Sequence, residues 1–331
     1  MAYLFQYKRY RLPMRVPLRT AHGMWTEREG IIVRLEDEGG QVGFGEIAPI
    51  PGFGTESLAE AEKACQNLGS KVGPAELDFL PETLTCVHFA IAMARMGGGG
   101  AIGTARLPVA ALLPAGAAAR PVLAAKLAAG FLAFKWKVGV FDIDEELGVL
   151  DELLSDLPAH AKLRLDANGV WTRREAARWL ERCAERPIEF VEQPVAPIEE
   201  DTLRGLARDY PVTLALDESV FRLVEARRWQ ALGWPGVFVL KPALAGPLED
   251  LVRWVLDTKA DAVISSAIET ALGRAVVLRA VLGRSVTKRA LGFGVGEIFG
   301  NPLWDGPAIG PLADADCIAV NAGPDIWSAL S

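Results

Sequence analysis

Three carboxylates recur along this 331-residue sequence at nearly even intervals, and each one ends a short apolar run. Asp166 ends KLRLD, Glu192 ends IEFVE and Asp217 ends VTLALD, at intervals of 26 and 25 residues. Each interval matches the length of one strand–loop–helix–loop unit. Side chains that end consecutive parallel strands lie on one rim of a barrel, where barrel enzymes form their active sites. The spacing therefore predicts that the three carboxylates converge.

Converging Asp, Glu and Asp side chains would bind a hard divalent cation through oxygen atoms alone. Oxygen ligands select Mg²⁺, with Mn²⁺ as a substitute, over zinc. No His/Cys cluster competes, because the three histidines are dispersed and the four cysteines show no CxxC spacing. A single carboxylate is more often a helix cap or half of an ion pair, but three at unit spacing favour a shared site. We therefore expect Asp166, Glu192 and Asp217 to be the ligands of a Mg²⁺ ion.

Three lysines accompany the carboxylates. Lys135 and Lys137 lie in the apolar run FLAFKWKVGVF, and Lys241 follows the run VFVL. Alternate residues share one face of a strand, so Lys135 and Lys137 are expected to point the same way, and Arg164 the same way as Asp166. Burying an ammonium group costs several kcal/mol unless it has a partner. The carboxylate cluster supplies that partner, and the lysines are expected in the same site.

The first part of the chain, residues 1–98, reads as a small α+β domain. Two strands are expected within 31–49, joined by a Gly-Gly turn and therefore antiparallel. Helices are expected over 57–73, with Ser57 as its cap, and over 80–96. The segment 98–103 matches the dinucleotide-binding pattern G-x-G-x-x-G only formally, because it comes after a helix rather than a strand. It is interpreted as a connector.

From residue 99 to residue 298 apolar runs alternate with amphipathic helices. Eight strands are expected, and charged residues end several of them, which favours a (β/α) barrel over an open sheet. The segment 299–331 has little periodicity and is expected to pack back on the first domain. The strands are expected to end near Leu113, Val138, Asp166, Glu192, Asp217, Lys241, Ser265 and Leu291, and the helices to cover 145–157, 172–185, 198–210, 223–233, 247–259 and 270–283.

Composition excludes several classes of partner. A net charge of −7 argues against a nucleic-acid surface. The first residues, MAYLFQYKRYRLPMR, lack the apolar core of a secretory peptide. The longest apolar stretch, 107–119, contains two prolines and a glycine and is too short to span a bilayer, which takes ~20 apolar residues. We expect a cytoplasmic enzyme that binds neither membrane nor nucleic acid; a monomer and a homo-oligomer both stay open.

Taken together, the motifs K-x-K, L-D-A-N, V-E-Q-P, L-D-E-S and V-L-K-P resemble those of the enolase superfamily, specifically its muconate-lactonising-enzyme subgroup. The resemblance extends over essentially the whole chain. It implies an N-terminal capping domain, a modified TIM barrel of the (β/α)₇β type and a Mg²⁺ ion held by the three carboxylates named above. It also implies that Lys137 and Lys241 flank the substrate on opposite faces, while Lys135 lowers the pKa of Lys137 by like-charge repulsion. Asn168 and Glu218 are expected to support the ligands.

Within that subgroup, segments 265–273 and 43–57 resemble o-succinylbenzoate synthases. These enzymes dehydrate 2-succinyl-6-hydroxy-2,4-cyclohexadiene-1-carboxylate in menaquinone and phylloquinone biosynthesis. The resemblance implies a small dicarboxylate substrate, covered by loops around Arg19–Trp25 and Pro51–Thr55, with His22 near it. The residues expected to contact the substrate are Arg164, Ser265, Ser266 and Gly292.

Two other functions stay open on the sequence. An N-succinylamino-acid racemase would use the same ligands and lysines but pass a proton between Lys137 and Lys241. A barrel that had lost catalysis would bind metal only, although retention of all three ligands and all three lysines argues against it.

Overall fold

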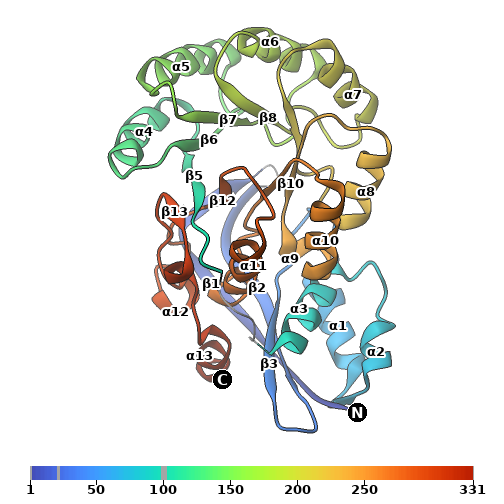
Figure 1. The fold of residues 1–331 in the computed structure, drawn as a ribbon. Coiled ribbons are helices and arrows are strands. Elements are labelled where there is room, and N and C mark those ends of the chain that lie inside the picture. The colour runs from blue at the N-terminus through green and yellow to red at the C-terminus, as the bar shows by residue number, and fades with distance from the viewer. Residues whose placement is uncertain (1, 21–22, 98–102, 331) are drawn as a thin grey trace.

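The computed structural model describes residues 2–20, 23–97 and 103–330, which form an antiparallel sheet and a curled parallel sheet (Figure 1). The antiparallel sheet has the order β3-β2-β1-β4. The parallel sheet has the order β11-β10-β9-β8-β7-β6-β5-β12, and β13 pairs with β5 beside this path. This is the α/β architecture predicted from the sequence, a modified barrel with an α+β cap.

The cap is built from the N-terminal residues much as the turn and helix signals indicate. The Gly-Gly turn joins β2 to β3, and Gly40 within it has a φ of 78°. Ser57 and Glu60 form the expected capping box of α1. The elements are β1 (Tyr3–Thr20), β2 (Gly23–Glu36), β3 (Val42–Ile47), α1 (Leu58–Leu68), β4 (Lys71–Val72), α2 (Pro74–Asp78) and α3 (Thr85–Met96).

Three expectations for the cap were wrong. The helix expected over 57–73 ends at Leu68, and Lys71–Val72 form strand β4. The described residues of the segment Arg19–Trp25 belong to strands rather than to a loop, because β1 runs to Thr20 and β2 begins at Gly23. Strand β1 was not predicted from the sequence. Strand β4 pairs only with the first two residues of β1, so most of β1 has no neighbouring strand on that side. Such edges tolerate charged side chains, which hide the apolar alternation of a strand. The helix expected over 80–96 starts at Thr85, because the preceding residues form a turn in which Leu84 N donates to Pro81 O (2.9 Å).

Helix α3 packs closely against β3 because two glycines share one face of that strand. A Cβ atom at Gly43 would lie 1.8 Å from Ala94 O, and one at Gly45 would lie 1.9 Å from Ala90 O. Real Cβ atoms do not approach carbonyl oxygens so closely, so both positions require glycine. The cap therefore depends on a backbone-to-backbone contact that larger residues would break.

The parallel sheet alternates with helices, and every strand expected from the sequence is present within the described residues. The strands are β5 (Leu107–Leu113), β6 (Ala133–Lys137), β7 (Lys162–Asp166), β8 (Ile188–Glu192), β9 (Leu214–Leu216), β10 (Val237–Leu240), β11 (Ala262–Ile264) and β12 (Leu291–Gly294). The helices are α4 (Ala119–Ala128), α5 (Ile143–Asp156), α6 (Arg173–Cys183), α7 (Glu200–Asp209), α8 (Leu223–Ala231), α9 (Pro242–Ala245), α10 (Leu248–Thr258) and α11 (Ala271–Arg284). Helix α4 was not expected, since its alanine-rich sequence shows little amphipathic contrast.

The curl of the parallel sheet brings its two end strands together. A parallel bridge joins Ser265, just after β11, to Gly292 of β12, and Ser266 N donates to Gly292 O (3.1 Å). The described strands thus form a ring of eight. Strands β6 and β10 are four places apart in that ring whichever way it is followed, so residues at their ends face each other across the mouth.

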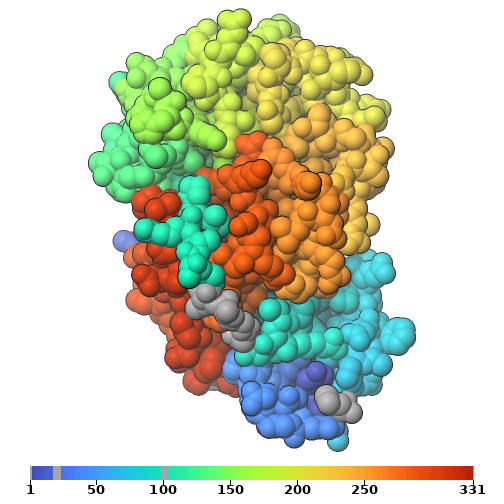
Figure 2. Space-filling view, in the orientation of Figure 1, coloured from blue at the N-terminus to red at the C-terminus, as the bar shows by residue number. Residues whose placement is uncertain are grey.

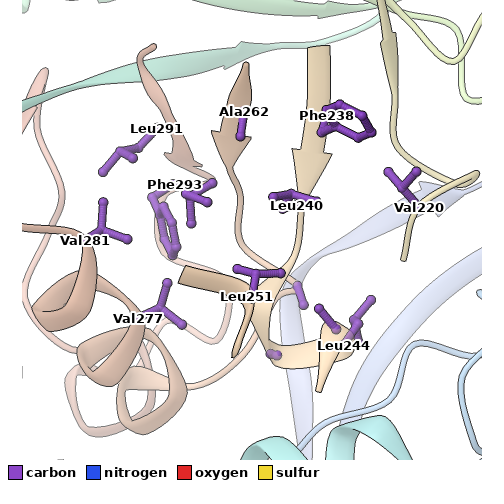
Figure 3. Close-up of a cluster of buried hydrophobic side chains, with 14 of the residues drawn as sticks. Val220, Phe238, Leu240, Leu244, Leu251, Ala262, Val277, Val281, Leu291 and Phe293 are labelled. Atoms are coloured by element: carbon purple, nitrogen blue, oxygen red, sulfur yellow. The ribbon is translucent and has the colours of Figure 1, made fainter. Parts of the chain in front are cut away.

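Successive side chains along each barrel strand point alternately to the outer helices and to the interior of the barrel. Trp136 and Leu165 are buried on the outer side, where the Trp136 ring meets the Trp179 ring of α6 edge-on (6.3 Å between centroids). Figure 3 shows Leu291 and Phe293 of β12 directed toward the side chains of α11. A separate apolar cluster fills the interior and consists of Phe190, Ala215, Val237, Val239 and Val263.

The C-terminal segment contains α12 (Pro302–Asp305), β13 (Leu312–Ala313) and α13 (Ala322–Ala329) and reaches back to the N-terminal sheet. Its Trp327 ring lies 6.0 Å from the Phe44 ring of β3, and Lys8 Nζ donates to Trp327 O (3.1 Å). In the space-filling view the segment, in red, lies at the surface beside the blue N-terminal residues (Figure 2). The domain limits at residues 98 and 298 stay a prediction.

The glycine contact beneath α3 predicts a large loss of stability on adding one methyl group. Gly45→Ala should destabilise the fold by about 2 kcal/mol or more, because neither backbone can move away without breaking the sheet. Gly148→Ala, in the exposed face of α5 with no neighbour near its Cβ, should instead stabilise it by about 0.5–1 kcal/mol. Urea unfolding measures both, and equal stability of the two variants would contradict the contact.

Candidate active site

A cavity of about 660 Å³ lies at the carboxyl ends of the barrel strands and is closed on one side by residues of the cap. Cap residues in its wall include Met24, Trp25 and the segment Ile50–Gly54. Thr55, at the end of the second expected loop, is not part of the wall. His22 and the side chain of Arg19 lie outside the described residues. The charged residues in the wall are Lys135, Lys137, Arg164, Asp166, Glu192, Asp217, Glu218 and Lys241.

The ring of strands sets where each of these groups lies. Asp166 and Glu192 end β7 and β8, and Asp217 follows β9, so the three carboxylates occupy one arc of the rim. Lys137 ends β6 and Lys241 follows β10, which places one lysine at each end of that arc. The sequence-predicted ligands and lysines are thus brought to one rim, with the two outer lysines across the mouth from each other.

Lys135 is the central cation of this arc. Its Nζ lies 2.7 Å from Asp166 Oδ2 and 2.8 Å from Glu192 Oε1. Burial tends to lower the pKa of Lys135, but the attraction of Asp166, Glu192 and Asp217 outweighs it and raises that pKa well above its usual value. The neighbouring carboxylates therefore favour the ammonium form of Lys135. The proposed effect of that charge on Lys137 stays a prediction.

Burial and mutual repulsion shift the pKa values of two of these carboxyl groups in opposite directions. Burial, followed by repulsion from Asp166, raises the pKa of Glu192 to about 8. Burial also acts to raise the pKa of Asp166, but the Lys135 ammonium outweighs it and the net shift is downward. In the part of the chain that the structure describes, no three His, Cys, Asp or Glu side chains stand at metal-binding distances; the carboxylates are paired with lysines.

Lys241 is held between an anion and an aromatic ring. Its Nζ forms an ion pair with the Asp217 carboxylate and lies 4.8 Å from the centroid of the Phe53 ring. Phe53 in turn meets the Phe221 ring edge-on, with 6.2 Å between centroids. A negative charge and a π face both stabilise an ammonium group. The sequence named the loop that carries Phe53, but nothing in it showed that this ring reaches Lys241.

Asn168 and Glu218 stand where the sequence expected supporting groups. Asn168 adopts a left-handed backbone (φ 47°), and its N–H donates to Asp166 Oδ1 (3.1 Å). Its side-chain Nδ2 donates to Glu218 Oε1 (3.2 Å). Burial, then repulsion from Asp217 and Asp166, raises the pKa of Glu218 to about 7.

Gln193 is a supporting residue that the sequence analysis missed. Its fully buried side chain joins two strand ends: Oε1 accepts from Asp217 N (3.1 Å) and Ser219 N (3.2 Å), while Nε2 donates to Ser219 Oγ (2.8 Å). The residue also adopts a positive φ of 38°. Its place directly after Glu192 in V-E-Q-P was the available signal.

Arg164 lies deeper in the cavity than Asp166. Its Nε donates to Glu189 Oε2 (2.7 Å), and its guanidinium lies 4.9 Å from the Phe190 ring centroid. Burial opposes ionisation of Glu189, but the charges of Arg164 and Arg289 lower the pKa of that carboxyl overall. Arg164 Nη2 is buried without a hydrogen-bond partner among the described residues. A role in substrate binding stays a prediction.

Ser265, Ser266 and Gly292 line the cavity on the side of the ring away from the carboxylates. Ser265 Oγ donates to Gly292 O (3.3 Å), and Ser266 Oγ donates to Glu269 Oε2 (3.0 Å). A Cβ atom at Gly292 would lie 2.4 Å from Ser265 Oγ, so a glycine keeps this wall open. Whether these residues contact a substrate carboxylate stays a prediction.

Known proteins share this arrangement of cap and barrel. The family model described as MenC, N-terminal domain matches residues 2–97, and the model described as enolase C-terminal domain-like matches residues 117–256. The o-succinylbenzoate synthase of Thermosynechococcus vestitus is 42% identical over 306 residues, covering 90% of this chain and 94% of that protein. This chain belongs to the o-succinylbenzoate synthase family.

Other members and neighbours agree with this assignment. The o-succinylbenzoate synthase of Yersinia enterocolitica is 34% identical and covers 80% of this chain and 82% of that protein. A crystal structure of the o-succinylbenzoate synthase from Thermosynechococcus elongatus BP-1, complexed with Mg in the active site, has a TM-score of 0.87 at 38% identity and covers 99% and 100% of the two chains. The L-Ala-D/L-Glu epimerase of Bacillus subtilis, with a TM-score of 0.77 at 22% identity and 96% and 97% coverage, shares the fold. Among the described residues no helix has the length and apolar character to cross a membrane.

The raised pKa of Glu218 predicts a pH-dependent stability in protein stripped of divalent cations. An unfolded Glu titrates near 4.3, whereas the folded pKa is about 7. Folding therefore gains from this group below about pH 4, and that gain is lost as the pH rises through about 7. Glu218→Gln should match the parent at about pH 4 and exceed it by about 1–3 kcal/mol at about pH 8. Urea unfolding at both pH values tests this, and a pH-independent difference would refute it.

Proposed function

We propose that this chain is an o-succinylbenzoate synthase, a carbon–oxygen lyase. It would catalyse the syn dehydration of 2-succinyl-6-hydroxy-2,4-cyclohexadiene-1-carboxylate to 2-succinylbenzoate in menaquinone or phylloquinone biosynthesis. The observation that carries the proposal is the pair Lys137 and Lys241, which face each other across the mouth of the barrel beside three buried carboxylates. The 42% identity to a synthase over nearly the whole chain supports it.

Mg²⁺ is the proposed cofactor, with Mn²⁺ as a substitute, and Asp166, Glu192 and Asp217 are the proposed ligands. The donor set fits, because the ligands are all oxygens and come from consecutive strands. The charge also fits: burial and mutual repulsion raise the pKa of Glu192 to about 8, and a nearby dication would relieve that repulsion. When bound, Mg²⁺ would supply positive charge that stabilises the enediolate as it forms.

Lys137 is the proposed base and acid. A neutral Lys137 would remove the proton α to the ring carboxylate and then, as an ammonium group, return it to the departing hydroxyl on the same face. Lys241 on the other face need only stay positive, and it contacts the Asp217 carboxylate and the Phe53 ring. Loss of water makes the ring aromatic, so the substrate itself provides much of the driving force.

The remaining substrate contacts are proposed because the residues concerned line the cavity. Arg164 lines the cavity, its Nη2 is buried without a hydrogen-bond partner among the described residues, and a guanidinium group is a donor suited to a dianionic substrate. Ser265, Ser266 and Gly292 are proposed to meet a carboxylate of the substrate on the opposite side. We also propose a cytoplasmic enzyme organised as a cap (1–98), a barrel (99–298) and a returning segment (299–331).

The direct test is an assay of purified protein with Mg²⁺ and the cyclohexadiene substrate, following the absorbance of the aromatic product. Turnover that disappears with a chelator and returns with Mg²⁺ supports the proposal. Racemisation of an N-succinylamino acid without any dehydration would favour the racemase instead, and Mg²⁺ binding without exchange of any α-proton would favour a barrel without catalysis.

Removing a single charge from each proposed ligand should abolish the Mg²⁺ site but not the fold. Asp166→Asn, Glu192→Gln and Asp217→Asn should each weaken Mg²⁺ binding at least about tenfold and reduce turnover below detection. Asp209→Asn, on the exposed end of α7, is the matched control and should behave as the parent. Calorimetric titration measures the affinity, and unchanged affinity in all three variants would show that the ligands are elsewhere.

Replacement by arginine should affect the activity differently at the two flanking lysines. Lys137→Arg should be inactive, because a guanidinium group is effectively never deprotonated in a protein. Lys241→Arg keeps the positive charge and should retain some dehydration activity, limited by the larger head group. Either substitution should eliminate any racemase activity, because racemisation needs proton transfer on both faces. Steady-state kinetics on both substrates separates these cases. Dehydration that survived in Lys137→Arg would overturn the assignment of the base.

A further inference from the structure

Arg28 of β2 lies behind the cavity wall and takes part in no step of the proposed reaction. Its side chain is 1% exposed. A guanidinium group has five N–H bonds in a fixed planar fork, and here all five point at backbone carbonyls. Nε donates to Ile268 O (2.9 Å), Nη1 to Glu29 O (3.1 Å) and Pro49 O (2.7 Å), and Nη2 to Ala48 O and Ala267 O (3.4 Å).

Apart from Glu29 O, which lies on β2 itself, these carbonyls belong to two segments that reach the cavity from different parts of the chain. Residues 48–49 lead directly into Ile50 of the cap, and the loop after β11 contributes Ile268 of the barrel; both isoleucines line the cavity. The Trp25 ring, a third part of the wall, lies 5.2 Å from Arg28 Cζ. One buried cation thus fixes an apolar wall assembled from three places in the sequence.

Ile268 adopts a backbone conformation that it would not adopt by itself. Its φ is 60°, in the left-handed region where β-branched residues are outliers. Two hydrogen bonds hold it there: Ile268 N donates to Ser266 Oγ (2.9 Å), and its carbonyl accepts from Arg28. Glycine would adopt this φ freely, so the isoleucine side chain is retained against a conformational cost.

The wall lies where the substrate must extend. The reacting carboxylate belongs at the arc formed by β7, β8 and β9, whereas Ile268 follows β11 on the other side of the ring. Relying on the proposed function, we propose that Arg28 is a positioning residue that holds Ile268 against the succinyl tail, and that Ile268 determines which tail lengths are accepted. Arg28 itself would not touch the substrate.

Arg28→Met removes the fork while keeping an apolar side chain of similar length. KM for the cyclohexadiene substrate should rise at least about tenfold, while kcat changes less than about threefold and Mg²⁺ affinity is unchanged, since the carboxylate arc is untouched. Arg34→Met, on the same strand but paired with Glu36 at the surface of the cap, is the control and should match the parent. Arg28→Lys offers three donors in place of five and should leave KM raised.

Ile268→Gly tests the wall independently and decides the question if Arg28→Met does not fold. It relieves the left-handed backbone, so the melting temperature should not fall, yet KM should rise about tenfold and a substrate with one more methylene in its tail should be used relatively better. Unchanged KM in a folded Arg28→Met or in Ile268→Gly, or full rescue by Arg28→Lys, would overturn the inference. An inactive parent enzyme that also fails to bind 2-succinylbenzoate would instead refute the proposed function.

Discussion

The compensation of buried negative charge at the ends of three neighbouring strands is the constraint on which this structure depends. Asp166, Glu192 and Asp217 are each at most 6% exposed, and isolated carboxylates would not stay ionised at such positions. Lys135 pairs directly with Asp166 and Glu192, and Lys241 pairs with Asp217, so each buried carboxyl group has a cationic partner. Burial and repulsion from Asp166 nevertheless raise the pKa of Glu192 to about 8, so the pairing compensates its charge only in part.

The framework that holds these groups is rigid where the chemistry requires it. Strands β6, β7 and β8 pair side by side, so the backbones of Lys137, Asp166 and Glu192 lie in one row. Gln193 then fixes the next strand end by accepting from the backbone of Asp217. Main-chain hydrogen bonds therefore set the spacing of the charged side chains, and the outer helices bury the opposite faces of the same strands.

How much of this could be read from the sequence depends on how local each signal was. The strand ends and their charges were predictable because alternation and repeat length are properties of adjacent residues, and the fold class followed from them. Strand β1 was not, because an edge strand rich in charges has no apolar pattern. Residues that act across long sequence distances were also missed. Arg28 contacts Ile268, and Phe53 contacts Lys241, only when the cap packs against the barrel. No pattern of adjacent residues predicts such contacts.

The seam between β11 and β12 has a consequence for how such an enzyme changes over time. A bridge at Ser265 and Gly292 closes the ring there, and the pairing of β12 with β5 has an irregular register. On the far side, the register of β7 with β8 shifts between Leu163 and Arg164 but is regular from Arg164 up to the pair Asp166 and Glu192. A mutation beside the seam can therefore reshape the part of the pocket that meets the variable end of a substrate without shifting the groups that move the proton. A barrel that closes at an isolated bridge, away from its proposed catalytic groups, is predisposed to acquire new substrates while keeping its chemistry.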